Sequence, residues 1–253
     1  MATAAGLRTQ GLDVHYGTFH AVKNVSVTIR ERCLTSLIGP SGCGKSSLLR
    51  AFNRMNDLIP GCRTSGVVEV NGARIYEGGT DIQALRRRVG MVFQRPNPFP
   101  LSVYENVAYG PRIHSTAKGL ALDEVVKRCL IAVSLWDELA NDLEQSALLL
   151  SAEKMQRLCI ARALAVEPSV LLMDEPCSSL DPGATMRIEQ LMRDLSSRYT
   201  ILVVTHNMQQ AARISDETGF MLLGELVEMG PTADLFTQPR DKRTEDYVTG
   251  RYG

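Results

Sequence analysis

The chain has 253 residues, of which 44% are apolar and 22% charged, and its 28 basic side chains balance its 28 acidic ones. This length allows one large α/β domain or two ordinary ones. Nucleic-acid binders usually carry a basic excess, so zero net charge argues against nucleic acid as a partner. The sequence has no run of about 20 apolar residues, which predicts that the chain does not cross a bilayer. Its N-terminus lacks a signal peptide's apolar stretch, and its 6 cysteines are scattered, which favours a cytoplasmic chain.

The first part of the chain is predicted to form an antiparallel β-layer. Apolar and polar residues alternate over 25–29, as in a half-buried strand. Segments 67–70 and 73–75 flank Asn71-Gly72, a dipeptide that favours a two-residue hairpin turn. We therefore expect β-structure up to about residue 76.

A glycine-rich loop, GPSGCGKSS, interrupts this β-rich part. It fits the pattern G-x-x-x-x-G-K-[ST], between a predicted strand at 34–38 and a predicted helix at 47–55. Inward-pointing amides and the helix N-terminus would hold nucleotide phosphates. Lys45 would reach the β- and γ-phosphates, and the Ser46 hydroxyl would bind Mg²⁺. The candidate nucleotide-binding residues are Gly39, Pro40, Ser41, Gly42, Cys43, Gly44, Lys45, Ser46 and Ser47.

Two adjacent carboxylates follow the buried strand predicted at 170–173. Asp174 emerges at the carboxyl end of this strand, where parallel sheets bind ligands, and we expect it to hold Mg²⁺. Glu175 follows directly and suits the orientation or deprotonation of an attacking water. Outside this context, Glu175 is a surface acid at a strand end.

Two further polar side chains follow predicted strands. His206 comes after the strand at 201–204, where it could hydrogen-bond a terminal phosphate and help to fix the water. Gln94 closes the strand at 89–93, and its amide could meet Mg²⁺ or the water. A lone histidine is more often structural, and a strand-end glutamine more often has no special role. We interpret His15, His20 and His114 as structural.

Together, these motifs resemble the ATP-binding cassette (ABC) family of transporter ATPases, over nearly the whole chain. The family's glutamine loop is similar to Phe93-Gln94, its catalytic strand to LLMDEP, its D-loop to Ser179-Leu180-Asp181 and its switch histidine to Thr205-His206. The resemblance implies that Asp181 contacts nucleotide and that Tyr16 stacks on adenine, although Tyr16 also fits a simple strand-end tyrosine. It implies an α/β P-loop NTPase fold with a RecA-like, mostly parallel sheet.

Longer phrases resemble the branch of this family that powers bacterial phosphate import. They are NRMNDLIPG, GMVFQRPNPFP, LCIARALAVEP, THNMQQAARISD and the closing TEDYVTGRYG. This resemblance implies ATP and Mg²⁺ as cofactors and a head-to-tail dimer with a second copy of the chain. It also implies two integral-membrane permease subunits and, indirectly, a phosphate-binding protein. The chain would then lie at the cytoplasmic face of the cell membrane as a peripheral protein.

The chain departs from the family at the signature segment, where LSGGQ is replaced by residues 150–154, LSAEK. Ser151 remains as a predicted N-cap of a helix over 152–165, with free N–H groups that favour an anion. Glu153 would repel a γ-phosphate, and Lys154 could offset it. The segment is compatible with a working ATPase, a weakened ATPase, or a regulatory or heterodimer-adapted subunit.

The resemblance divides the chain into a nucleotide-binding core at 1–95 and 157–253 and an inserted helical subdomain at 96–156. Within the insertion, segments 120–132 and 134–143 are amphipathic and predict helices. After residue 168 the chain returns to βα units and ends in a hairpin over 220–229.

The segment 96–100, with Phe99 and Tyr104, is either a groove for a permease helix or a plug for the helical core. The resemblance favours the groove. An ABC ATPase for another substrate and a non-transport cassette ATPase remain alternatives. A small-molecule kinase has less support, because Arg86-Arg87-Arg88 is better interpreted as a solvated face.

Overall fold

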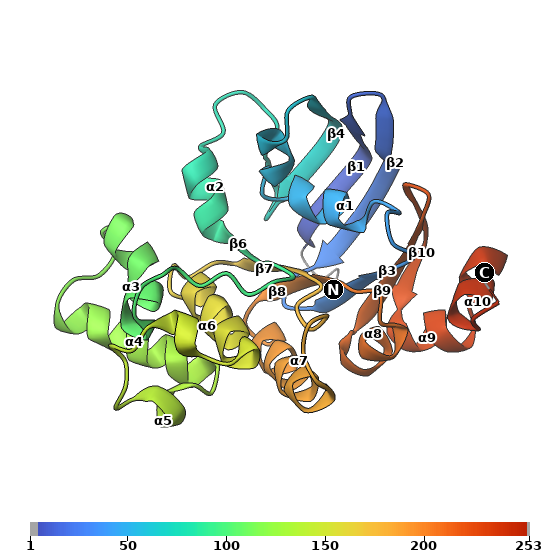
Figure 1. Ribbon diagram of the computed structural model, residues 1–253. Coiled ribbons are helices and arrows are strands. Elements are labelled where there is room, and N and C mark those ends of the chain that lie inside the picture. Colours follow the sequence, from blue (N-terminus) through green and yellow to red (C-terminus); the bar gives the residue numbers. More distant parts are fainter. Residues whose placement is uncertain (1–4, 252–253) are drawn as a thin grey trace.

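Two β-sheets lie one above the other in the computed structural model, which describes residues 5–251 (Figure 1). The upper sheet is antiparallel, with strand order β2-β1-β4-β5. Its strands are β1 (Ala5–Tyr16), β2 (Phe19–Arg30), β4 (Cys62–Val70) and β5 (Ala73–Arg74). The predicted turn joins β4 to β5, and its residues Asn71 and Gly72 have φ of 48° and 77°, as this hairpin type requires. The predicted β-layer is therefore confirmed.

The lower sheet has six strands, in the order β10-β9-β3-β8-β7-β6. They are β3 (Leu34–Ile38), β6 (Val89–Val92), β7 (Val170–Asp174), β8 (Thr200–Val204), β9 (Glu217–Leu222) and β10 (Glu225–Pro231). Strand β10 pairs antiparallel with β9 and closes the predicted C-terminal hairpin, while the other strands pair in parallel. The mostly parallel sheet of a P-loop NTPase is thus present.

The lower sheet is buried on both faces because it separates two apolar cores. Along β7, Val170 and Leu172 pack upward against α1 (Lys45–Ala51) and the β-layer. Leu171 and Met173 point downward into a second core with the helices below. This alternation is the period-2 pattern of a strand, and burial on both faces explains why β7 is apolar at each of these positions.

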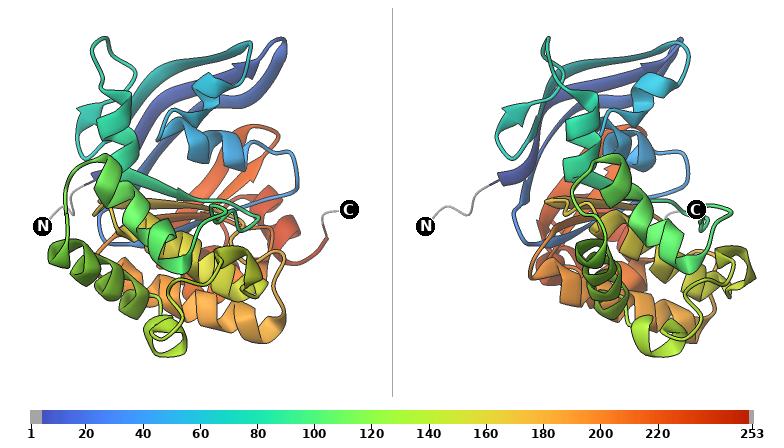
Figure 2. Two further views of the ribbon diagram at one scale, coloured as in Figure 1. Left: turned by 60° about the vertical axis from the view of Figure 1, so that its left-hand side comes forward. Right: turned by 90° about the vertical axis from the view of Figure 1, so that its left-hand side faces the viewer.

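Helices cover the lower face and one end of the molecule (Figures 1 and 2). Below the sheet lie α6 (Ala152–Leu164), α7 (Pro182–Ser196), α8 (Met208–Ile214) and α9 (Thr232–Thr237), while α10 (Lys242–Val248) stands at the end beside β10 and α2 (Ile82–Arg88) leads into β6. The end that carries the predicted insertion is built from α3 (Val103–Ile113), α4 (Leu120–Ala132) and α5 (Trp136–Leu139). No helix in the described part of the chain combines the length and the apolar character that a membrane span needs.

Two predicted helices differ from the observed ones. The helix predicted over 134–143 is wrong in extent, because only Trp136–Leu139 is helical. Ser134 has a left-handed φ of 55°, which a right-handed helix cannot include. The helix predicted over 47–55 begins earlier, at Lys45, and ends at Ala51, since Arg54 has a φ of 57°.

The predicted boundary at residues 156/157 falls inside α6. This helix packs against α3 and α4, and its apolar residues share one core with strands of the lower sheet. Helix α6 therefore connects the helical end to the sheet, and the division at this residue stays a prediction. Residues 1–4 and 252–253 of the predicted domain lie outside the described part.

Candidate nucleotide site

The glycine-rich loop connects β3 to α1 at the carboxyl edge of the lower sheet. Gly39 and Gly44 have φ of 147° and 102°, and a Cβ at either residue would lie within 2.3 Å of a main-chain oxygen, of Met221 and Ala21 respectively. Only glycine fits these two positions. A Cβ at Gly42 would meet no atom within 4 Å, so this part of the loop faces open space. The loop leaves room for a ligand directly above its backbone.

The Lys45 side chain lies across the loop. Its Nζ donates to the carbonyl oxygens of Gly39 at 2.7 Å and Pro40 at 2.8 Å, and contacts the Cys43 sulfur at 3.6 Å. These contacts hold the buried Lys45 residue, which is 5% exposed, against the loop. Burial raises the pKa of the Cys43 thiol, and the nearby Lys45 charge opposes that rise. The loop thus concentrates positive charge where phosphates are predicted to bind.

Two predicted metal ligands meet beside the loop. The Ser46 hydroxyl donates to Oδ1 of Asp174 at 2.7 Å, and Arg50 donates to Oδ2 at 3.0 Å. Asp174 is the last residue of β7, and its side chain is only 8% exposed. A hydroxyl and a carboxylate oxygen in contact form the hard-oxygen donor set that Mg²⁺ prefers. The residues present therefore fit this ion.

Two strand-end side chains converge on the carboxylate of Glu175. Oε2 of Glu175 accepts a hydrogen bond from Nε2 of Gln94 at 3.2 Å and lies 3.0 Å from Nδ1 of His206. Glu175 has a φ of 49°, and its N–H donates to the Val204 carbonyl at 2.9 Å. The sharp turn after β7 thus holds Glu175 in a backbone conformation that costs free energy, which is common at functional sites. The Gln94 amide contacts Glu175 rather than Ser46 or Asp174, and its role as a metal ligand stays a prediction.

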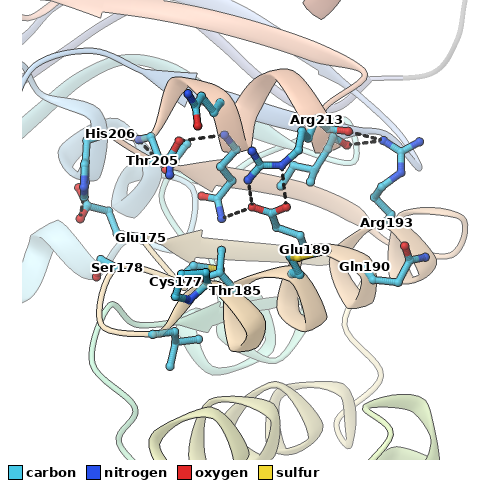
Figure 3. Close-up of a pocket in the computed structure, with 17 residues that line it drawn as sticks. Glu175, Cys177, Ser178, Thr185, Glu189, Gln190, Arg193, Thr205, His206 and Arg213 are labelled. Carbon is cyan, nitrogen blue, oxygen red and sulfur yellow. Dashed lines mark hydrogen bonds and ion pairs between the residues drawn. The ribbon is translucent and has the colours of Figure 1, made fainter.

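Glu175 lies between two pockets. The smaller one, of about 290 Å³, is lined by Tyr16, Lys45 and Ser46 together with loop residues. The larger one, of about 780 Å³, extends past His206 between α7 and α8 to the ion pair of the buried Glu189 with the exposed Arg213 (Figure 3). A carboxylate in this position can face a phosphate on one side and a water on the other.

Two aromatic side chains border the smaller pocket. The Tyr16 hydroxyl donates to Oδ1 of Asn56 at 2.9 Å and lies 3.1 Å from Oγ of Ser47, and burial raises its pKa. Phe19, which pairs with Tyr16 across the β1–β2 turn, is 61% exposed beside the pocket. Sequence reasoning missed Phe19, and its position three residues after Tyr16 in a hairpin was the available signal. It also missed Arg50, one helical turn after Ser46.

The remaining candidates, Ser151 and Asp181, cap helices. The Ser151 hydroxyl accepts the N–H of Lys154 at 3.4 Å, and the Asp181 carboxylate accepts that of Ala184 at 2.9 Å. The predicted helix start at Ser151 is thereby confirmed. Neither side chain lines the pocket at the glycine-rich loop in the described part of the chain, so contact with nucleotide stays a prediction.

Glu153 and Lys154 bind different partners. Glu153 is bound by Arg187 at 2.7 and 3.0 Å and by Arg157 at 3.1 Å, while Lys154 pairs with Glu138 at 2.9 Å. Neighbours on one helix turn point in different directions, so Lys154 reaches α5, while Glu153 contacts α7 and Arg157 of its own helix.

Comparisons with known proteins identify the family. Residues 22–178, more than half of the chain, match the model of the ABC transporter family. The chain therefore belongs to the ABC transporter family. It is 55% identical, over 96% of its own length and 97% of theirs, to proteins from two strains of Streptococcus pneumoniae that are named phosphate import ATP-binding protein PstB 3.

Solved structures support the same fold. CbiO1 from Clostridium perfringens, described as part of the transporter complex cbiONQ, superposes with a TM-score of 0.83 at 25% identity and covers 98% of this chain and 97% of its own. A bacterial Atm1-family ABC exporter with ATP bound gives a TM-score of 0.80 at 24% identity, covering 100% of this chain and 43% of its own. The second likeness concerns the fold alone.

Proposed function

We propose that this chain is the ATP-hydrolysing subunit of an ABC importer for inorganic phosphate. The convergence of Gln94 and His206 on Glu175, directly beside the glycine-rich loop, carries the proposal. This arrangement provides a base and a phosphate-contacting imidazole at the edge of a pocket that contains Lys45. Phosphate as the transported ion is supported by the names of the Streptococcus relatives.

In this proposal each side chain has a defined task. Lys45 binds the β- and γ-phosphates, while Ser46 and Asp174 hold Mg²⁺, which neutralises phosphate charge when bound. Glu175 accepts a proton from, or orients, the attacking water. His206, 55% exposed, hydrogen-bonds the γ-phosphate and holds the carboxylate of Glu175 in place.

A second copy completes the site. We infer that two chains face each other head to tail, so that Ser151 and Asp181 of one copy contact the nucleotide held by the loop of the other. Both residues begin helices, and Ser151 is exposed at the surface of the single chain. Closure on ATP and opening after hydrolysis would then drive the membrane subunits.

The helical end offers a surface for two membrane permease subunits. Phe99 is half-buried, with its ring 4.6 Å from that of Tyr109 and 4.4 Å from the Arg162 guanidinium. Tyr104 packs partly against the core, and its hydroxyl donates to Asp123. Both therefore contribute to packing, while Leu101 and Leu149 nearby are 39% and 79% exposed. We propose that this side docks a permease helix at the cytoplasmic face of the membrane.

The decisive experiment is co-purification with co-expressed permease subunits, followed by ATP turnover and phosphate uptake in vesicles. We expect phosphate with its binding protein to stimulate both activities. Stimulation by sulfate or molybdate, but not by phosphate, would support an ABC importer for another substrate. Absence of turnover with every oxyanion would support a non-transport role.

A further inference from the structure

The start of helix α6 is held by a network of five charged side chains. The two carboxylate oxygens of Glu153, in the first turn, accept hydrogen bonds from Nε and Nη2 of Arg187 at 2.7 and 3.0 Å. Nε of Arg157, one turn later, is 3.1 Å from the same carboxylate. The Glu153 side chain is only 13% exposed. Its negative charge is therefore compensated by arginine side chains of the same chain.

Arg157 is the buried centre of this network. Its side chain is 6% exposed, its Nη1 donates to the Ser134 carbonyl at 2.7 Å, and its Nη2 donates to Glu138 at 2.8 Å. Lys154 binds the other oxygen of Glu138 at 2.9 Å. Three basic and two acidic side chains thus connect α5, α6 and α7, and leave one positive charge in excess at the start of α6.

The pair of Glu153 and Arg187 links two helix starts that matter to the proposed function. Helix α6 begins at the Ser151 cap and α7 at the Asp181 cap. Arg187 lies in the second turn of α7, close enough to its start that the guanidinium is 3.8 Å from the position of a Cβ at Gly183. A two-point guanidinium–carboxylate contact fixes orientation as well as distance, which a single contact does not.

We propose that Glu153 is a positioning residue: through Arg187 it holds the Ser151 end of α6 against the start of α7, so that Ser151 is presented to the nucleotide bound by a second copy. This inference rests on the proposed function. It assigns the unusual acid in this segment a defined task, because glycine there could not form the pair and would leave the helix start more mobile. Glu153 acts through Ser151 and does not itself touch nucleotide.

The test compares Arg187→Gln with Arg128→Gln in the full chain carrying Glu175→Gln, which should retain bound ATP. Arg128 forms an exposed pair with Glu167 at 2.8 Å, far from the start of α6, and is the matched control. Sedimentation gives the ATP concentration for half-maximal dimerisation. We expect Arg187→Gln to raise it about five- to tenfold and the control to change it less than about twofold. ATP affinity of the dilute monomer should stay unchanged in both.

A double-variant cycle with Glu153→Gln and Arg187→Gln separates positioning from general stability. If the pair acts as a unit, the double variant dimerises no worse than Arg187→Gln alone, and Arg187→Lys recovers part of the loss. Equal dimerisation of Arg187→Gln and the control, or an effect that follows the melting temperature alone, would overturn the inference. If the chain with native Arg187 binds ATP but neither dimerises nor, with Glu175 intact, hydrolyses it, the proposed function itself fails and the inference with it.

Discussion

The edge of the lower sheet and the start of α6 are built in different ways. At the sheet edge, Ser46 contacts Asp174 and His206 contacts Glu175 at short distances, and the strand register brings these two pairs to one edge. At the start of α6, side chains from three helices hold the segment. Where strand register fixes the position of a catalytic side chain, few substitutions are tolerated. A segment that is held by ion pairs tolerates Ala152 and Glu153 in place of the two glycines of the family pattern. The departure from the family pattern occurs in the second region.

The largest expected effect comes from Glu175→Gln at the sheet edge. The amide keeps its shape but cannot accept a proton, so ATP turnover should fall about 10³-fold while ATP binding persists. Turnover and nucleotide affinity, measured separately, check this. Gln190→Ala, in the same larger pocket, is the control and should keep turnover within about twofold. A fall of less than about tenfold in Glu175→Gln would remove its role as the base.

Asp174→Asn should act next, through the metal. Its carboxylate accepts from both Ser46 and Arg50, and the neutral amide lowers the affinity for Mg²⁺. We expect the Mg²⁺ concentration for half-maximal turnover to rise at least tenfold or so, since even residues that only support metal ligands change affinity by about 10- to 100-fold. Arg50→Gln keeps the contact of Ser46 with Asp174. This variant should change the Mg²⁺ concentration for half-maximal turnover only about threefold. Equal Mg²⁺ dependence in Asp174→Asn and the native chain would exclude this role.

The same contrast explains how much could be predicted from sequence. The loop, β7 and β8 are local patterns, and parallel pairing brings their ends to one edge, so Lys45, Asp174 and Glu175 could be predicted to lie near one another. The pair of Glu153 and Arg187 joins residues 34 positions apart on different helices, and only the packing of α6 on α7 brings them together. For the same reason, the sequence alone does not show that Lys154 binds Glu138 on α5.

Restoring both glycines, with Ala152→Gly and Glu153→Gly together, should have a smaller effect. The variant loses the ion pair and two good helix formers, so the free energy of unfolding should fall by about 1–2 kcal/mol in urea titrations. Dimerisation should need more ATP, as in Arg187→Gln. Turnover at saturating ATP should stay within about threefold of the native chain. A severalfold rise in turnover would instead show that the native segment is a weakened γ-phosphate clamp.

The smallest effect concerns pH and Glu138. Burial raises the pKa of this carboxyl, but the hydrogen bonds from Lys154 and Arg157 outweigh burial and lower it below its usual 4.5. The unfolded chain then binds the proton more tightly than the folded one, so Glu138 contributes stability above about pH 4.5 that is lost as pH falls through the lowered value. Melting temperatures of the native chain and Glu138→Gln should therefore approach each other from about pH 6 to about pH 3. Asp137→Asn, at an exposed neighbour on α5, is the control for loss of a carboxylate from this helix. A constant difference between the native chain and Glu138→Gln would mean that this carboxylate contributes nothing to holding the start of α6.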